Sequence, residues 1–416
     1  MAELMIKGGQ RLLGEFTVQG AKNSALPLLA ACFCVSGQCV LTGVPRLSDV
    51  GATVEILRHL GCSVRWEGHT VVVNARAPRS YKIPSQLMQA LRSSIFLLGP
   101  LLARLGMAEI SEPGGCPIGA RPIDLHLQAM EQMGARIHYG EEKITLRTPK
   151  GLHGATIRLH FPSVGATENI LMAAATAHGK TQLIGAAREP EIVDLARFLN
   201  ACGAKIHGAG TNEITIEGVR RLDGCTYQVM PDRIIAGSTL AAAAVTGGEV
   251  LLRGVVHEHL APILPPLRRM GCRITPVNDT LHLRAPRRLQ SFGTLITAPY
   301  PGFPTDAQAA FLALACTATG TSHIEETIFE RRFRQVRAFS KMGAHIRLKD
   351  TRATIYGVPR LHGARVEAMD LRGGAALVVA ALAAEGNTTI THAELIDRGW
   401  ENVSQVIGRG GVRNQE

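Results

Sequence analysis

The run PGGCPIGARPID, from Pro113 to Asp124, places one thiol in a loop dominated by glycine and proline. Glycine admits backbone conformations that other residues resist and proline fixes φ, so the loop can move as a unit and still present Cys116 in a defined pose. Arg121 follows five residues later, and a nearby cation makes a thiol easier to ionise. The run therefore predicts a reactive cysteine, either a nucleophile or a proton donor. The alternative is an ordinary surface loop that holds a cysteine.

Carboxylates form a second group of candidates. Asp306, in PYPGFPTDAQAAF, lies where three prolines stop and a helix is expected to start. Its side chain either caps that helix or is held to accept a proton from a hydroxyl. The runs DLRGGAAL and IDRGW set Asp370 near Arg372 and Asp397 beside Arg398, each with a following glycine. We expect the acid to orient the guanidinium and the glycine to leave backbone room for a ligand.

Cations are expected at helix starts. In GAKNSALP, Lys22 precedes Asn23 and Ser24, both good N-caps, and in LRSSIFLLGP Arg92 leads into an apolar helix. A cation beside a helix N-terminus makes an anion site, although such a residue is often simply solvated. Four more arginines follow the run ETIFE, of which most are expected to face water and one or two to bind an anion bidentately: Arg331, Arg332, Arg334 and Arg337.

Size and charge narrow the class of protein. The 416 residues exceed the roughly 250–300 at which single hydrophobic cores stop growing, so two domains are expected. The formal net charge of +11 suits anionic small molecules or nucleic acid. Because the sequence has no long Lys/Arg block and no basic stretch interleaved with aromatics, we favour anionic small-molecule substrates over nucleic acid.

One unit recurs along the chain: a helix, a glycine, a strand, a turn and another strand. A glycine that ends a helix in the left-handed region marks each copy, and the alternation from Ala344 to Arg347 is typical of a half-buried strand. The markers lie roughly 70 residues apart, longer than the thin repeats of solenoids, at Gly61, Gly134, Gly203, Gly271 and Gly343. A degraded sixth copy is expected around Gly408–Gly411. Pro190–Asn200 predicts a second helix within a unit, and two sets of three units account for the length.

Other sequence patterns indicate which cofactors the protein needs and in which compartment it is found. Cys32 and Cys34 lack a second pair at zinc spacing, and His257 and His259 lack the helical spacing of zinc hydrolases, so no metal is expected. Neither a P-loop nor a dinucleotide fingerprint is present. The first residues lack the apolar core of a secretory signal, and the nine cysteines lie far apart in sequence, so we expect reduced thiols in the cytoplasm. The apolar run 25–35 is too short to cross a bilayer and predicts a buried helix.

Together these runs resemble the UDP-N-acetylglucosamine enolpyruvyl transferases of bacterial cell-wall synthesis (the MurA family) over nearly the whole chain. The resemblance rests on GAKNSALP, RSSIFLLGPLLAR, PGGCPIGARPIDLH, SVGAT, AAREPEIVD, PGFPTDAQ, FERRF, DLRGGAAL and IDRGWE. The cysteine loop is specific to this family among its relatives.

The resemblance implies an α/β fold of two inside-out α/β barrel domains, each built from three of the repeat units. The first domain would span 22–230 and carry a mobile cysteine loop at about 112–124; the second would combine 1–21 with 231–416, with the active site in the cleft between them. The implied reaction moves the enolpyruvyl group of phosphoenolpyruvate to the 3′-hydroxyl of UDP-N-acetylglucosamine and releases phosphate. It starts peptidoglycan synthesis, on which cell shape and division depend, and needs no cofactor. The epoxide fosfomycin is expected to alkylate Cys116.

The resemblance also implies a role for each candidate. The catalytic set would be Cys116, Asp306, Lys22, Arg398 and Asp370. Cys116 would protonate the methylene carbon or form an adduct, Asp306 would take the hydroxyl proton, and Asp370 would assist proton movement and anchor the arginines. Phosphoenolpyruvate would be held by Lys22, Arg92, Arg121, Arg372 and Arg398. The sugar nucleotide would be bound by Asn23, Arg92, Arg121, Pro122, Ile123, Asp124, Leu125, Ser163, Val164, Gly165, Asp306 and Ile328.

The chain departs from the family pattern in two places. Phe161 stands where a lysine is frequent, and the stretch after IDRGW is shorter than the usual helix–strand ending. Three rival interpretations are a shikimate-pathway enolpyruvyl transferase, a catalytically silent paralogue and a nucleic-acid-binding protein. No membrane insertion is expected, and the sequence leaves the oligomeric state open.

Overall fold

The computed structural model describes residues 2–111, 113–115, 118–401 and 403–408. The chain divides into two compact units. Unit 1 comprises Met1–Gln19, Pro117–Ala120 and Pro231–Glu416, and unit 2 comprises Gly20–Cys116 and Arg121–Met230. The domain bounds expected from the sequence differ from these units at residues 20–21 and at Pro117–Ala120. Each unit has a hydrophobic core of its own.

Unit 2 alternates short helices with short strands. Its helices are α1 (Lys22–Cys32), α2 (Ser48–His59), α3 (Ser85–Ala90), the 3₁₀ helix η1 (Arg92–Leu97), α4 (Leu98–Leu105), α5 (Asp124–Gln132), α6 (Val164–Ala174) and α7 (Pro190–Ala201). Its strands are β3 (Gln38–Thr42), β4 (Ser63–Glu67), β5 (Thr70–Asn74), β6 (Met107–Ile110), β7 (Arg136–Tyr139), β8 (Ile144–Arg147), β9 (Thr156–Arg158), β10 (Lys180–Ile184), β11 (Lys205–His207), β12 (Glu213–Glu217) and β13 (Thr226–Gln228). Within the described residues they form the sheets β13-β3-β5-β4, β6-β8-β7 and β11-β12-β10-β9.

Unit 1 repeats this plan. Its helices are α8 (Arg233–Val245), η2 (His257–Leu260), α9 (Leu264–Arg269), α10 (Thr305–Thr317), α11 (Val336–Lys341), α12 (Leu371–Ala383), η3 (Ala393–Arg398) and α13 (Val403–Gly408). Its strands are β1 (Glu3–Lys7), β2 (Leu13–Thr17), β14 (Glu249–Arg253), β15 (Arg273–Val277), β16 (Thr280–Arg284), β17 (Thr294–Ile296), β18 (Thr321–Glu325), β19 (His345–Lys349), β20 (Arg352–Tyr356), β21 (Arg365–Glu367) and β22 (Asn387–Thr391). Where the structure describes it, this unit contains the sheets β15-β16-β14-β2, β17-β18-β20-β19 and β1-β22-β21.

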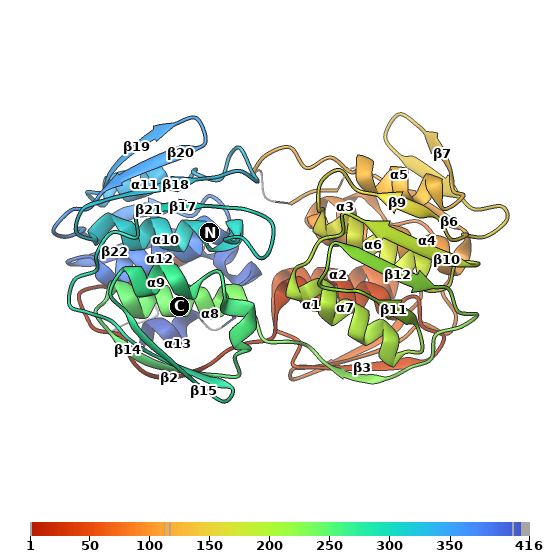
Figure 1. Ribbon diagram of the computed structural model, residues 1–416, viewed down its shortest axis with the longest axis horizontal. Helices are drawn as coiled ribbons and strands as arrows, with labels where there is room; N and C mark the ends of the chain where they lie inside the picture. Colours follow the sequence, from red (N-terminus) through yellow and green to blue (C-terminus); the bar gives the residue numbers. More distant parts are fainter. Residues whose placement is uncertain (1, 112, 116–117, 402, 409–416) are drawn as a thin grey trace. The chain divides into compact units, whose positions relative to one another are not determined.

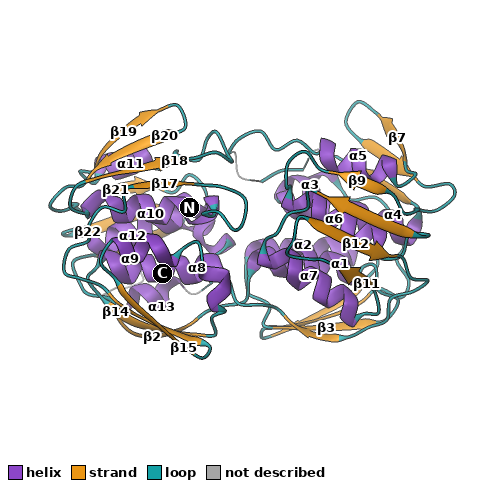
Figure 2. Ribbon diagram, viewed as in Figure 1, coloured by secondary structure: helices purple, strands orange, loops and turns teal. Residues whose placement is uncertain are grey.

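Helices fill the interior of each unit and strands lie outside them (Figures 1 and 2). In unit 1 the inner helices α8, α10 and α12 are buried along nearly their whole length and pack against one another. A helix that is apolar on every side is stable only when it is surrounded by protein, which explains the runs LAAAAV and LVVAALA. Each unit is therefore the inside-out α/β barrel expected from the sequence, and the apolar run 25–35 lies buried in and just after α1.

The repeat markers are confirmed. All of the marker glycines adopt positive φ, from 91° at Gly343 to 101° at Gly203, directly after a helix. The strand predicted at 344–347 is present as β19, and the helix predicted at 190–200 is α7, with Glu191 in its first turn.

The sixth repeat is completed differently from the expectation. The sequence assigned its hairpin to the run around Gly408–Gly411. Gly408 ends α13, and residues 409–411 lie outside the described residues. The strand that pairs antiparallel with β22 is instead β1, with Glu3 opposite Thr391. The N-terminal strand thus occupies the place that β20 holds beside β18 in the neighbouring sheet.

Candidate active site

In unit 2, Arg92 and Arg121 come together around the start of the cysteine loop. Gly115 has a φ of +112°, and a Cβ added there would lie 2.8 Å from Arg121 Nη2 and 2.9 Å from Arg92 Cβ. Arg92 also donates from Nη1 to the carbonyl of Pro113 at 3.3 Å. Only glycine fits this place, because it accepts the positive φ and leaves room for both side chains. Cys116, the next residue, lies outside the described residues.

A buried histidine, His126, lies close enough to Arg92 to feel its charge. His126 is 6% exposed, and its Nδ1 lies 2.8 Å from Asn169 Nδ2. The Asn169 amide is oriented by Gly99 N–H, which donates to its Oδ1 at 2.7 Å, and by the carbonyl of Ile95, which accepts from Nδ2 at 2.9 Å. Nδ2 is therefore a donor, His126 Nδ1 must accept, and the ring proton is on Nε2.

Electrostatics keep this imidazole neutral. Burial, and then the positive charge of Arg92, lower the pKa of His126 to about 4, and Asp124 opposes the shift. The ring packs against the start of α6, since a Cβ on Gly165 would lie 3.2 Å from His126 Cε1. Arg92 at the start of η1, Asp124 at the start of α5 and Gly165 at the start of α6 thus all lie near one uncharged histidine.

Apart from Asn23, which lies at the start of α1, the predicted sugar-nucleotide residues of unit 2 lie at or just before these same helix starts. Ser163 caps α6 by accepting from the N–H of Ala166 at 3.3 Å. Pro122 and Asp124 are exposed; half-buried are Ile123, Leu125, Ser163, Val164 and Gly165. Phe161 is 43% exposed just before α6.

Lys22 begins α1 and is paired with an acid that the sequence analysis did not single out. Its Nζ lies 2.5 Å from Asp49 Oδ2, and both side chains are about nine-tenths buried, at 10% and 9% exposure. The expectation that Asn23 and Ser24 cap this helix is wrong, because Ala21 is the N-cap. Ser24 donates instead to Asp194, and Asn23 is half-buried.

In unit 1, Asp306 lies between two guanidiniums. Arg332 donates to its Oδ1, and Arg372 donates from Nη2 to Oδ2 at 2.8 Å. Both arginine side chains are buried, at 4% and 7% exposure, whereas that of Asp306 is 28% exposed. The alternative that Asp306 caps α10 is wrong, since Pro304 is the N-cap. The two guanidinium groups fix the direction of the carboxylate, which positions it to accept a proton.

Glu326 fixes the loop that carries Ile328. This buried carboxylate accepts from Thr297 Oγ1 at 2.9 Å, from Thr305 Oγ1 at 2.8 Å and from the N–H of Ile328 at 2.9 Å. It thereby ties the first turn of α10, next to Asp306, to the predicted sugar-nucleotide contact.

Asp370 binds backbone N–H groups. Its Oδ1 accepts from the N–H groups of Arg372 and Gly373 at 3.0 and 2.9 Å and caps α12. The guanidinium of Arg372 is held by Asp306, 66 residues away in sequence. The expected local pairing of acid and arginine is thus replaced by a cap and a long-range ion pair. Arg398 ends η3 and is half-buried.

Sequence reasoning missed Asp49, His126, Asn169 and Glu326 as partners of candidate residues. His126 lies inside the run PGGCPIGARPIDLH and could have been found there, and Glu326 binds the N–H of Ile328 only two residues away. Asp49 and Asn169 pair with residues distant in sequence, which no local pattern reveals. Among the described residues, no group of three His, Cys, Asp or Glu side chains is arranged to hold a metal ion. Nor does any helix in the described ranges have the length and apolar character needed to cross a bilayer.

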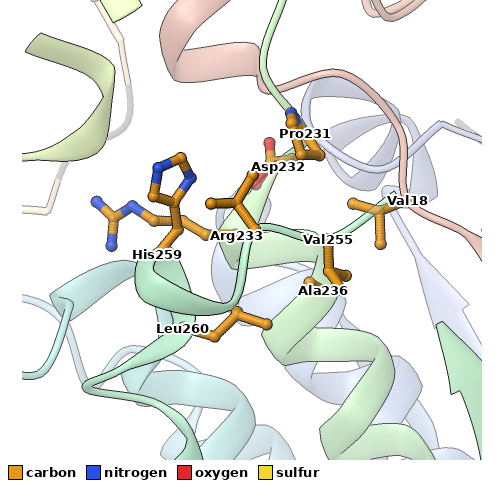
Figure 3. Close-up of a pocket in the computed structure, with 9 residues that line it drawn as sticks. Val18, Pro231, Asp232, Arg233, Ala236, Val255, His259 and Leu260 are labelled. Carbon is orange, nitrogen blue, oxygen red and sulfur yellow. The ribbon is translucent and has the colours of Figure 1, made fainter. Parts of the chain in front are cut away.

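A small pocket in unit 1 lies at the start of α8 (Figure 3). Val18, Asp232, Arg233, His259 and Leu260 are among its lining residues, and no residue of the predicted site lines it. Asp232 caps α8 by accepting from the N–H groups of Ile234 and Ile235. The guanidinium of Arg233 lies over the Tyr300 ring, 5.7 Å from its centroid.

Comparison with known proteins decides the family. The family model for EPSP synthase (3-phosphoshikimate 1-carboxyvinyltransferase) matches residues 6–407. The chain is 47% identical over 414 residues to UDP-N-acetylglucosamine 1-carboxyvinyltransferase 2 of Caldanaerobacter subterraneus subsp. tengcongensis. It is 49% identical over 414 residues to UDP-N-acetylglucosamine 1-carboxyvinyltransferase of Nitratidesulfovibrio vulgaris, and both alignments cover 99% of each chain. The chain belongs to the UDP-N-acetylglucosamine 1-carboxyvinyltransferase family.

Solved structures agree with this assignment of fold. The enolpyruvyl transferase NikO from Streptomyces tendae is similar with a TM-score of 0.89 and 25% identity, covering 98% of this chain and 97% of that one. EPSP synthase from Acinetobacter baumannii is similar with a TM-score of 0.77 and 21% identity, covering 98% of both chains. The shared architecture extends through the enolpyruvyl transferases, while the higher identity singles out the family with the sugar-nucleotide name.

Proposed function

We propose that this protein transfers the enolpyruvyl group of phosphoenolpyruvate to the 3′-hydroxyl of UDP-N-acetylglucosamine, with release of phosphate. The observation that carries the proposal is the 47–49% identity, over 99% of the chain, to proteins named for this activity. The reaction starts peptidoglycan synthesis, and we place it in the cytoplasm, with small-molecule substrates and no nucleic-acid partner.

The proposed chemistry adds an alcohol across a carbon–carbon double bond and then eliminates phosphate. It needs a base for the hydroxyl, an acid for the methylene carbon and cations for two anionic groups. Asp306 is the base, and its fixed direction between Arg332 and Arg372 supports that role. Cys116 is the acid or forms the covalent adduct.

The anionic groups of phosphoenolpyruvate are assigned to Lys22, Arg92, Arg121, Arg372 and Arg398. The convergence of Arg92 and Arg121 on Gly115 supports an anion site beside the cysteine loop. Asp370 is proposed to act through its cap on α12, which fixes where Arg372 leaves the helix, and to assist proton movement. In this proposal the domains 22–230 and 1–21 plus 231–416 share one active site in the cleft between them, and closure of the loop at 112–124 excludes water.

The sugar nucleotide is assigned mainly to helix starts and loops. Asn23 would bind the sugar, and N–H groups at the start of α6 suit a diphosphate because helix N-termini attract anions. The proposed contacts are Asn23, Arg92, Arg121, Pro122, Ile123, Asp124, Leu125, Ser163, Val164, Gly165, Asp306 and Ile328.

The test is incubation of the purified protein with phosphoenolpyruvate and UDP-N-acetylglucosamine, followed by phosphate measurement and mass analysis of the sugar nucleotide. We expect phosphate release together with an enolpyruvyl adduct of the nucleotide. Shikimate 3-phosphate in place of the nucleotide is the matched control, and turnover with that acceptor alone would refute the proposal. Exposure to fosfomycin with the nucleotide present should add one inhibitor molecule at Cys116; an unchanged intact mass would contradict the role of that thiol.

A further inference from the structure

Four cysteines of unit 2 lie close together at a place that no step of the proposed reaction uses. Cys32 ends α1, Cys39 lies in β3, Cys202 follows α7 and Cys225 precedes β13. The Sγ atoms of Cys202 and Cys225 are 3.3 Å apart, and all of these cysteines are reduced. Cys225 is also the neighbour of Cys39 across the parallel strands, where Val40 N–H donates to the carbonyl of Cys225 at 2.9 Å.

Backbone contacts hold the two close sulfurs in a fixed frame. The N–H of Asp223 donates to the carbonyl of Cys202 at 2.8 Å, so the segment before Cys225 is tied directly to the end of α7. Gly224 presses against β3, since a Cβ there would lie 2.0 Å from the carbonyl oxygen of Gln38. A disulfide has sulfurs about 2.05 Å apart, so the pair needs a shift of only about 1 Å to bond.

Solvent reaches this cluster through one member. Cys225 is partly exposed, whereas Cys202 is 2%, Cys32 1% and Cys39 0% exposed. Hydrogen bonds from Cys202, Cys225 and Cys32 to the Cys39 sulfur lower the pKa of Cys39. The hydrogen bond with Cys202 lowers the pKa of Cys225, but the hydrogen bond with Cys39 and burial outweigh it and raise that pKa to about 11, so the reactive thiolate of Cys225 forms more readily as the pH rises.

We propose that Cys202 and Cys225 are a peroxide-modified site that closes into a reversible disulfide. The Cys225 sulfur, after losing its proton to solvent, attacks a peroxide oxygen; the O–O bond breaks, and the hydroxide takes up a proton from solvent and leaves as water. The Cys202 sulfur then attacks the Cys225 sulfenic acid, the S–O bond breaks, and the Cys202 proton leaves in a second water. Two thiols give up two electrons, and hydrogen peroxide becomes two waters.

The bridge joins the end of α7 to the start of β13. That strand leads to Met230, whose N–H donates to Asp194 at 3.4 Å and whose carbonyl accepts from Ala21 N–H at 2.7 Å. The closed loop, which spans 23 positions in sequence, loses entropy mainly in the unfolded chain, so the oxidised protein is the more stable form. The site lies beyond the proposed function and does not depend on it.

Mapping on the full wild-type chain tests the pairing. The protein is treated with hydrogen peroxide, and its remaining thiols are blocked with one alkylating reagent. The disulfides are then reduced, labelled with a second reagent and located by peptide mass spectrometry. We expect the second label on Cys202 and Cys225 together and its loss when reductant follows the peroxide. A bridge between Cys39 and Cys225, oxidation of Cys225 to sulfinic acid without a bridge, or no second label in unit 2 would each overturn the proposal.

Variants test the consequence. Peroxide should raise the melting temperature of the wild type by roughly 5–10 °C and leave that of Cys225→Ser unchanged. Cys272→Ala is the matched control and should keep the shift, since Cys272 is a buried thiol of unit 1 whose pKa burial raises to about 12. A shift that persists in Cys225→Ser would refute the bridge. The mapping decides the pairing even where that variant folds poorly.

Discussion

Helices α1 and α10 occupy equivalent places in their units, because each precedes a strand that pairs in parallel with a neighbour: β3 with β13 and β18 with β17. Their first turns nevertheless carry opposite charges. Helix α1 begins with Lys22, paired with one carboxylate, whereas α10 presents Asp306 between two guanidiniums. The Lys22 pair is almost fully buried, while the Asp306 side chain keeps 28% of its surface exposed.

In the proposed function, this difference lets equivalent helices of the repeat serve two kinds of chemistry. At α1 a cation is paired with a buried acid, and Arg92 and Arg121 come together around Gly115 elsewhere in unit 2. At α10, two guanidinium groups hold one carboxylate in place. The repeated architecture places a side chain at the start of each equivalent helix, and a partner on another element decides how that side chain is paired. We propose that this pairing separates anion binding at Lys22 from proton acceptance at Asp306.

The largest expected effect is at Asp306. Asp306→Asn keeps the shape but removes the proton acceptor, so kcat should fall by about 10²–10⁴-fold in the phosphate-release assay. Asp350→Asn makes the same change at an exposed turn residue of unit 1 and should leave kcat unchanged. A loss of less than about tenfold would show that Asp306 is not the general base, and the proposed contrast between the two helix starts would then fail.

The two ion pairs should differ in stability when a cation is removed. Lys22→Met leaves the buried Asp49 without its ammonium group and should lower the free energy of unfolding by about 3–5 kcal/mol. Arg372→Met leaves Asp306 with Arg332, so its loss should be about 2 kcal/mol. Urea unfolding measures both. Equal losses would show that the burial of the Lys22–Asp49 pair carries no extra cost, and the double variant Lys22→Met/Asp49→Asn should recover part of the first loss.

His126 should make unit 2 sensitive to acid. Folding lowers the pKa of His126 from 6.5 to about 4. Between these two pH values the unfolded chain therefore binds a proton on His126 that the folded chain does not bind. Its contribution is complete above about pH 6.5 and should decline by roughly 1.4 kcal/mol per pH unit as the pH falls toward about 4.

Urea unfolding at pH 7 and pH 5 measures this decline. His126→Gln should reduce the difference between the two pH values, and His138→Gln, at an exposed histidine of the same unit, should preserve it. An unaltered pH dependence in His126→Gln would place the acid sensitivity on other groups.

The smallest effect concerns Phe161, where the family resemblance led us to expect a lysine. Phe161→Lys adds a cation just before α6 and should lower the KM for UDP-N-acetylglucosamine by about two- to fivefold, the size of a solvent-exposed charge interaction. Leu348→Lys is the control, since Leu348 is equally exposed, at 43%, but lies on β19 of unit 1. A KM that responds equally to both variants would indicate a general effect of net charge.

The repeat plan could be predicted from the sequence because its signals are local. Each marker glycine needs only its own helix end to require a positive φ, and the apolar alanine runs are recognisable as buried helices without knowledge of what covers them. The sequence did not reveal that the antiparallel partner of β22 is β1, because that strand comes from the opposite end of the chain. The capping roles predicted for Asn23, Ser24 and Asp306 failed as well, since the helix starts leave these side chains to other partners.

The sequence by itself determined the repeat, the inner helices and the family, since glycine conformation, apolar runs and short motifs are properties of neighbouring residues. Only the tertiary structure decided that Asp306 would hold Arg372, that Asp49 would pair with Lys22 and that Cys202 would meet Cys225. Charges and thiols interact through space over a few ångströms, and the residues that approach so closely are chosen by how the helices and sheets pack.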